Sequence, residues 1–377
     1  MKWSYYFFAT FLIIFSSQLQ AMRIYNKEGN KIDVYGKMEV KNVVSDSFLN
    51  KGDKSFIEYG VKGETQISDQ IYGFFKIESK IKIRQDQKTT NNLGLGFIGV
   101  DFGEMGSIDY GRNYGVLYEI NSWTSSILEN NTVFPDNFLS HKANSVLTYR
   151  NKNFFGNVNG LNFVLQYQGK NVTKSDIKDP KVENGQGFGT LVYYDFDNGI
   201  STGASYTNHK KTKLQKSLSE YEKYLGDSKK NAQSYALGIK YDINSLYLSA
   251  LYKETRNMST FGDFDEDEKK ENLFGFPEKI KNIELVAQYN FGFGFCPSIG
   301  YSQSSLYDKK AKIHNHFIEK YLELCAKYNF NKNVSTFFDC KINLLKKNKK
   351  DAEEKIKSNL LDINKDNKFS IGIKYSF

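Results

Sequence analysis

Side chains able to do covalent or metal chemistry are few in this chain and poorly spaced for it. There are four histidines and three cysteines, and no two cysteines form a C-x-x-C pair. Nucleophilic catalysis would need a serine or aspartate beside an oriented histidine, whereas we expect every histidine in a loop or at a loop edge. A pair such as His314 and His316 is weak evidence for a metal site. No cofactor is implied, and an enzyme is the weakest hypothesis. The remaining residues of these types are His141, His209, Cys296, Cys325 and Cys340, and the cysteines are expected in strands.

Charged side chains are abundant, and their spacing indicates contact with water rather than catalysis. Between Lys31 and Lys41 every second residue is charged or tyrosine, and the residues between them are apolar or glycine. A similar alternation occupies 56–67 and 71–84. Period-two alternation places the charges on one face of a strand and the apolar side chains on the other. Faces so dense in charge suit a water-filled lumen and not a packed protein core.

The N-terminus has the form of a secretory signal peptide, which we expect to occupy residues 1–21. Lys2 supplies a positive charge, and the segment from Tyr5 to Phe15 is apolar but too short to span a bilayer. No later stretch reaches about 18 uncharged apolar residues, so we expect no transmembrane helix in residues 22–377. An exported chain of alternating strands is either a secreted sandwich with one wet face per sheet or a transmembrane β-barrel.

The C-terminal strand favours the barrel. Residues 368–377 alternate between lysine, serine or glycine and large apolar side chains, and the sequence closes on Phe377. A terminal aromatic residue on the apolar face resembles the signal by which outer-membrane barrels are recognised for assembly. Soluble chains usually end in loose polar segments, so we expect Phe377 to be this assembly signal.

The alternating segments together predict an all-β fold, a 16-stranded antiparallel transmembrane β-barrel. Short connections near 242–244 and 329–331 alternate along the chain with long polar inserts, as the periplasmic turns and extracellular loops of outer-membrane barrels do. The long inserts lie near 208–231, 258–278, 304–317 and 346–366. The predicted strands are 31–41, 56–67, 71–84, 93–102, 106–113, 145–151, 160–169, 187–196, 199–208, 232–242, 245–256, 280–290, 293–303, 318–329, 333–345 and 368–377.

Composition and net charge decide little between functions. The chain has 26 Tyr, 30 Phe and only 4 Pro, which suits strands with one wet face. The coding bias of an AT-rich genome would also raise Lys, Asn, Ile, Phe and Tyr. The net charge of +9 could indicate nucleic acid or an anionic membrane surface. Because the lysines are spread over the whole chain and no nucleic-acid motif occurs, we expect no nucleic-acid partner.

Specific segments resemble the trimeric general porins of enterobacterial outer membranes. They include VKGETQI (61–67), GSIDYGRNYGVLYE (106–119), VNGLNFVLQYQGKN (158–171) and IGIKYSF (371–377), in the order that the family has them. The resemblance implies a homotrimer in the cell outer membrane, surrounded by lipopolysaccharide, through which small hydrophilic solutes and ions diffuse passively. It also implies a third loop, from about residue 114 to 144, that folds inward and narrows the lumen.

The resemblance further implies a constriction in which basic residues of the wall face acidic residues of the third loop. Such a crossed field selects solutes by charge. On the wall, Lys37 and Lys142 match basic positions, but Glu58 and Gly94 stand where the family has basic residues. We therefore expect a pore that is wider near Gly94 and has a weaker transverse field, with an ion preference that the sequence leaves open.

The third loop keeps only part of the acidic pattern of the family. Glu119 and Glu129 fall at or near acidic positions, and Asp136 supplies a further acid, while Ser125 replaces another. Each of these residues could also be an ordinary solvated side chain of the lumen.

Two other functions remain open for a barrel of this kind. A substrate-specific sugar channel would use aromatic side chains along the lumen, and four have inward parity: Tyr35, Phe56, Tyr72 and Phe74. A structural or surface-receptor barrel would work through its loops and have a narrowed, non-conducting lumen.

Overall fold

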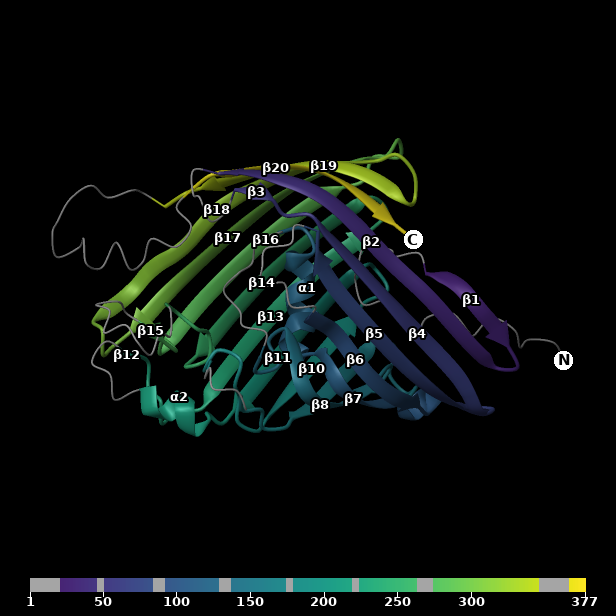
Figure 1. The fold of residues 1–377 in the computed structure, drawn as a ribbon, viewed down its shortest axis with the longest axis horizontal. Coiled ribbons are helices and arrows are strands. Elements are labelled where there is room, and N and C mark those ends of the chain that lie inside the picture. The colour runs from purple at the N-terminus through teal and green to yellow at the C-terminus, as the bar shows by residue number, and fades with distance from the viewer. Residues whose placement is uncertain are drawn as a thin grey trace.

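The computed structural model describes residues 21–45, 51–83, 92–128, 137–173, 179–218, 224–262, 274–345 and 366–377, and its main sheet closes into a barrel (Figure 1). Sixteen strands form the barrel, and each is antiparallel to its neighbours. The ring is closed because β2 pairs with β4 on one side and with β20 on the other. The predicted fold class is confirmed. The barrel strands are β2 (Asn30–Ser45), β4 (Phe56–Ser68), β5 (Ile71–Lys82), β6 (Asn92–Asp101), β7 (Ser107–Tyr114), β8 (Lys142–Asn151), β9 (Leu161–Gln168), β10 (Gly187–Asp195), β11 (Ile200–His209), β13 (Ala232–Ile243), β14 (Leu246–Arg256), β16 (Lys279–Tyr289), β17 (Phe295–Asp308), β18 (Ile313–Asn329), β19 (Val334–Asn343) and β20 (Lys368–Ser376).

Alternation along each strand separates an apolar outer face from a polar inner face. In β20, Ile371 and Ile373 are 63% and 50% exposed, whereas Ser370 before them and Gly372 between them are buried. This is the period-two pattern that the sequence predicted. Among the described residues, no helix is long and apolar enough to cross a membrane. The predicted signal peptide lies almost wholly in residues 1–20, outside the described residues.

The seam of the barrel joins the two ends of the chain. A short strand that the sequence did not predict, β1 (Met22–Lys27), pairs with the first half of β2, and β20 pairs with the second half. Between them the backbones of Gly36 and Phe377 exchange two hydrogen bonds of 3.0 and 2.9 Å. A Cβ on Gly36 would lie 2.8 Å from the ring of Phe377. Gly36 therefore makes room for the terminal aromatic ring at the seam.

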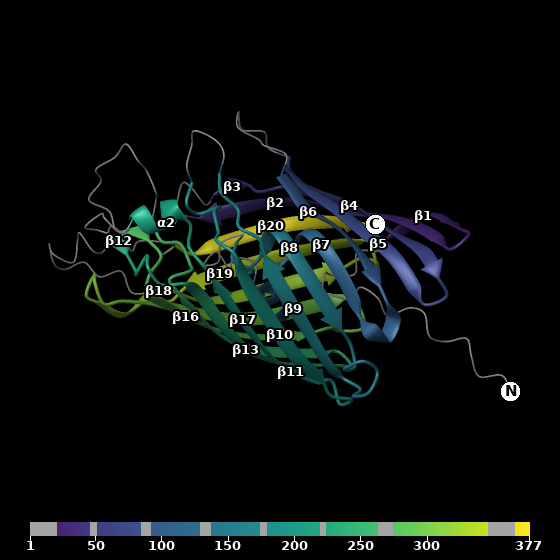
Figure 2. The same cartoon turned by 90° about the horizontal axis from the view of Figure 1, so that it is seen from below.

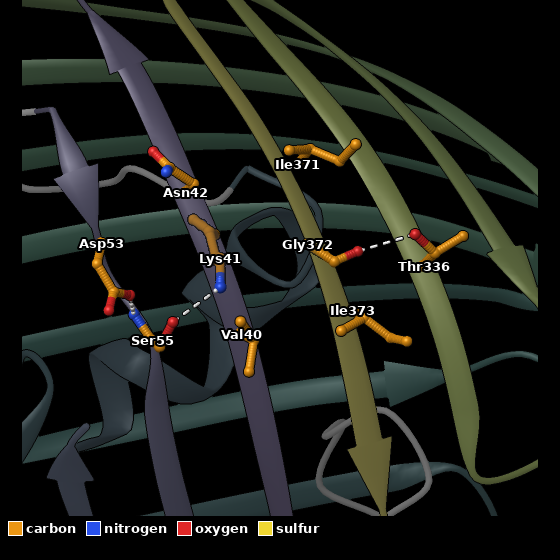
Figure 3. A pocket seen from close by; sticks show the side chains of 9 residues that line it. All are labelled: Val40, Lys41, Asn42, Asp53, Ser55, Thr336, Ile371, Gly372 and Ile373. Atoms are coloured by element: carbon orange, nitrogen blue, oxygen red, sulfur yellow. Dashed lines mark hydrogen bonds between the residues drawn. The ribbon is translucent and has the colours of Figure 1, made fainter. Parts of the chain in front are cut away.

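Farther along the seam, side chains add hydrogen bonds between strands (Figure 3). The short strand β3 (Gly52–Asp53) pairs with β2, and the hydroxyl of Ser55 accepts from the backbone N–H of Lys41 at 3.1 Å. On the other side, Thr336 donates to the carbonyl of Gly372 at 2.9 Å. A groove of about 520 Å³ follows these residues. The seam is thus held by side chains as well as by the ladder of the sheet.

The two ends of the barrel differ in their connections (Figure 2). At one end lie α2 (Lys213–Ser217), β12 (Tyr224–Leu225) and β15 (Phe274–Gly275), all within predicted long inserts. At the other end the turns are tight, and Asn244, with φ of 55°, lies in a two-residue turn that joins β13 to β14. Asparagine tolerates this left-handed conformation.

The prediction for one of the long inserts is wrong. The segment 304–317 was expected to be a long polar loop, but β17 and β18 remain paired out to Asp308 and Ile313. The strands extend because their apolar residues Leu306 and Ile313 are buried in a cluster with Leu225 and Phe261 from the long connections. His314 and His316 consequently lie in β18 and not in a loop. Residues 346–365 of the predicted insert 346–366 lie outside the described residues.

Candidate pore constriction

The inner wall formed by β2, β4 and β5 carries charges that face one another across the strands. Lys37, Glu58 and Lys80 are direct neighbours in the register of the three strands. The amine of Lys37 lies 3.2 Å from a carboxylate oxygen of Glu58. The amine of Lys80 lies 3.6 Å from the centre of the Phe56 ring. Opposite charges on adjacent strands stabilise the sheet, and here they also set the potential of the lumen wall.

Glu78 is a second inward carboxylate on this wall, and it is buried with a side-chain exposure of 5%. Its Oε2 accepts a hydrogen bond of 3.1 Å from the hydroxyl of Tyr35 and lies 3.3 Å from the amine of Lys76. Its Oε1 accepts from the amine of Lys142, also at 3.3 Å. A buried carboxylate requires such partners, because an unpaired buried charge is costly.

Gly94 lies where the register of β5 and β6 shifts between Glu78 and Ser79. A Cβ on Gly94 would be 3.1 Å from both the Lys142 amine and the backbone carbonyl of Glu78. The space left by the missing side chain is therefore filled by Lys142, which reaches over it from β8 to Glu78. The predicted widening of the pore near Gly94 stays a prediction.

The third loop contains a helix, α1 (Val116–Ser125), which contacts the inner sides of β9, β10, β11, β13, β14 and β16 (Figure 1). Trp123 packs where the wall carries glycines, since a Cβ on Gly203 or Gly238 would lie 3.2 or 2.9 Å from its ring. The apolar residues of the helix and wall form one buried cluster, which includes Leu117 and Ile120.

Both ends of α1 are completed by polar side chains of the wall. Helix termini leave backbone groups without partners inside the helix. At the start, where Gly115 offers no side-chain cap, Gln166 accepts a 2.7 Å bond from the N–H of Val116. At the end, the hydroxyls of Tyr247 and Ser249 donate to the carbonyl of Trp123 at 2.6 and 2.7 Å. The wall thus fixes where α1 begins and ends.

The loop acids predicted for the constriction are only partly described. Glu119 forms a 2.5 Å ion pair with Arg150 of β8, and its side chain is 10% exposed. Its charge is therefore compensated within the wall. Glu129 and Asp136 lie outside the described residues. Near the end of α1, Thr124 donates a hydrogen bond to Glu284, which also lies 3.9 Å from the amine of Lys253.

The structure brings together the four predicted wall residues and adds one that was missed. The neighbouring patches around Glu58 and Glu78 contain Lys37, Lys142 and Gly94. Glu78 itself was not singled out in the sequence. Its inward parity in β5 was visible, but its partners Tyr35 and Lys142 come from other strands. Among the described residues, no group of three or more His, Cys, Asp and Glu could hold a metal ion.

A closed barrel with an apolar outer face, a charged inner wall and a helix packed inside it defines a membrane channel of the porin class. The chain belongs to the Gram-negative porins, whose family profile matches residues 27–377. These proteins are transport channels rather than enzymes, and their place is the cell outer membrane.

Individual porins match nearly the whole chain. It is 42% identical to outer membrane protein F of Serratia marcescens over 342 residues, covering 87% of this chain and 88% of that protein. It is 39% identical to the outer membrane porin PhoE of Escherichia coli K12, covering 97% of both. Salmonella typhi OmpF, solved in complex with daunomycin, superposes with a TM-score of 0.80 at 35% identity, covering 94% of this chain and all of that one.

Proposed function

We propose that three copies of this chain assemble into a homotrimer whose barrels pass small hydrophilic solutes and ions by passive diffusion. The observation that carries the proposal is the contrast between two faces of the barrel. The inner wall around Glu58 and Glu78 is charged, whereas the outer face is apolar. A lumen lined with paired charges is wetted by water, and the charges act on passing ions at short range.

In this proposal the constriction lies between that wall and the third loop. The wall contributes Lys37, Glu58, Gly94 and Lys142, and the loop contributes acids from the set Glu119, Glu129 and Asp136. The transverse field is weak, because Glu58 and Glu78 compensate lysines on the wall and Arg150 compensates Glu119.

Two further proposals concern export and assembly. We propose that residues 1–21 are a cleaved signal peptide and that Phe377 is the assembly signal. The contact of Phe377 with Gly36 at the seam supports this role, because the signal then also completes the closing strand pair. The loops would contact lipopolysaccharide. The proposal includes no catalytic activity.

A sugar-specific channel is less well supported than a general pore. It would use the inward aromatic residues, but the hydroxyl of Tyr35 is bound to Glu78 and the ring of Phe74 contacts Phe97. The ring of Phe56 lies beneath the amine of Lys80. Tyr35, Phe56 and Phe74 are therefore each in contact with another side chain of the wall.

Recording single channels of the refolded mature protein in a planar bilayer tests the proposed function. A trimeric general pore is expected to give conductance steps in groups of three. Added sugars should not block its current. Saturable, sugar-blocked current would favour the specific channel. Silence from folded trimers would contradict the proposal and favour a structural or receptor barrel.

A further inference from the structure

His209 is a buried titratable side chain at the end of β11, outside the charged wall of β2, β4 and β5. Among the described residues, neither of its ring nitrogens has a hydrogen-bond partner. Its neighbours in register are Ala232 of β13 and Gly187 of β10, where a Cβ would collide with the imidazole. A neutral imidazole has one N–H donor, whereas the imidazolium has two donors and a full charge. Protonating the ring in place would therefore bury an unpaired charge, which is costly.

The ring of Phe138 covers His209 from the third loop. The two ring centres are 5.6 Å apart, and the rings are inclined at 68°. Phe138 belongs to residues 137–140, which lead from the third loop back toward β8 and which we call the return segment. In this segment the carbonyl of Leu139 accepts a hydrogen bond of 3.1 Å from the N–H of Leu117 in α1. The return segment thus connects the surroundings of His209 to α1.

The return segment holds two bulky residues in the left-handed conformation. Phe138 and Leu139 have φ of 54° and 58°, a region that such residues adopt only when their surroundings hold them there. Both side chains are fully buried. The side chain of Asn137 donates to the carbonyl of Glu183 at 2.7 Å and accepts from the N–H of Phe138 at 2.9 Å. Because packing holds this strained backbone in place, a disturbance beneath it favours its release.

In the described part of the chain, no charged group bonds to His209. Lys211 donates to the backbone carbonyl of Asp227 at 3.1 Å. The carboxylate of Glu183 accepts from the hydroxyl of Thr212 at 2.7 Å. A proton on His209 would therefore find no carboxylate partner in these contacts. The titratable groups on the surrounding connections are Lys210, Lys211, Glu183, Asp227 and His141.

We propose that His209 makes the docking of the third loop sensitive to acid, because the return segment packs on the neutral ring and is released when the ring takes up a proton. A free imidazole is protonated near pH 6.5. Docking is therefore complete above that pH. Below it, the equilibrium shifts toward release about tenfold for each pH unit, since only the released form binds the proton. This inference adds regulation by pH to the pore, and any effect on current rests on the proposed function.

Hydrogen–deuterium exchange of the refolded mature protein between pH 7.5 and 4 tests the proposal, after correction for the intrinsic pH dependence of amide exchange. The reporting amides are those of Gly115 and Leu117, which donate to the carbonyls of His141 and Leu139. We expect their exchange to accelerate about tenfold for each unit below pH 6.5. Exchange that stays equally slow down to pH 4 would overturn the proposal.

Variants attribute the effect to the imidazole. His209→Phe keeps a ring beneath Phe138 but cannot take up a proton, so its exchange should not accelerate in acid. His209→Leu replaces it if the larger ring prevents folding. The matched control is His314→Gln, which changes an exposed histidine beside Tyr307 and should exchange like the wild type. If H209F accelerates in acid as the wild type does, another group is responsible and the assignment of His209 is wrong.

Current recorded from the same protein in planar bilayers separates this inference from the proposed function. Silence from the folded wild type would contradict the proposed pore, whatever the exchange shows. A conducting wild type whose exchange accelerates in acid, beside an H209F variant whose exchange does not, is the result expected if both hold.

Discussion

The two sides of the lumen both carry glycines in the wall, but different side chains fill the space beside those glycines. On the wall of β2, β4, β5 and β6, glycines at 60 and 94 make room for polar side chains that converge on Glu78. On the wall of β11 and β13, glycines at 203 and 238 make room for the ring of Trp123. One wall keeps its charges beside the water of the lumen, and the other is covered by α1. The side chain that fills the space beside each glycine therefore determines whether that wall faces the lumen or is covered by α1.

The largest effect is expected from removing the anchor of α1. Trp123→Ala should destabilise the docked helix by about 3–5 kcal/mol, the usual cost of deleting a buried large aromatic side chain. The loop should then leave the wall, raising single-channel conductance and lowering the melting temperature of the trimer. Leu237→Ala is the control, because Leu237 is 58% exposed on the outer face. If W123A behaves like this control, the ring does not anchor the loop.

Breaking the ion pair at the start of α1 should have a smaller effect. Arg150→Gln leaves Glu119 without its cation, and hydrogen bonds to charged groups contribute about 1.5–3 kcal/mol. Thermal melts of R150Q trimers should show a lower midpoint. Lys230→Gln, which removes an exposed 3.8 Å pair with Asp227, should melt like the wild type. Equal midpoints for both variants would show that the Glu119–Arg150 pair does not hold the loop.

Adding a side chain at Gly94 tests whether this part of the charged wall lines the constriction. Gly94→Arg should displace the amine of Lys142, which a Cβ at this position already approaches to 3.1 Å, and should lower single-channel conductance. Gly292→Arg is the control, because a Cβ there meets nothing within 4 Å. An unchanged conductance in G94R would remove Gly94 from the constriction.

Most of the fold could be predicted from the sequence because each strand carries its own signal. The alternation in 368–377, for example, is set by the water on one face and the apolar surroundings on the other, and neither depends on distant residues. Where packing decides the structure, prediction failed. Residues 304–317 look polar, but Leu306 and Ile313 find partners in connections far along the chain. The strand Met22–Lys27 is exposed throughout and shows no burial alternation.

The candidate site was predicted in part for the same reason. The inward parity of Lys37, Glu58 and Lys142 could be read locally or from the resemblance to porins. The importance of Glu78 could not, because it depends on which side chains reach it. Tyr35 lies two strands away and Lys142 three. A glycine in register beside an inward carboxylate, as Gly60 is beside Glu78, is the one local signal that could have indicated it.

The most direct test of the difference between the two walls is access of a charged thiol reagent during current recording. Lys80→Cys and Ser249→Cys are introduced separately after Cys296, Cys325 and Cys340 are changed to serine. Lys80 is exposed on the charged wall, whereas Ser249 is 6% exposed beneath α1. A drop in current for K80C and none for S249C is the predicted result. Rapid modification of S249C together with an inert K80C would contradict the account.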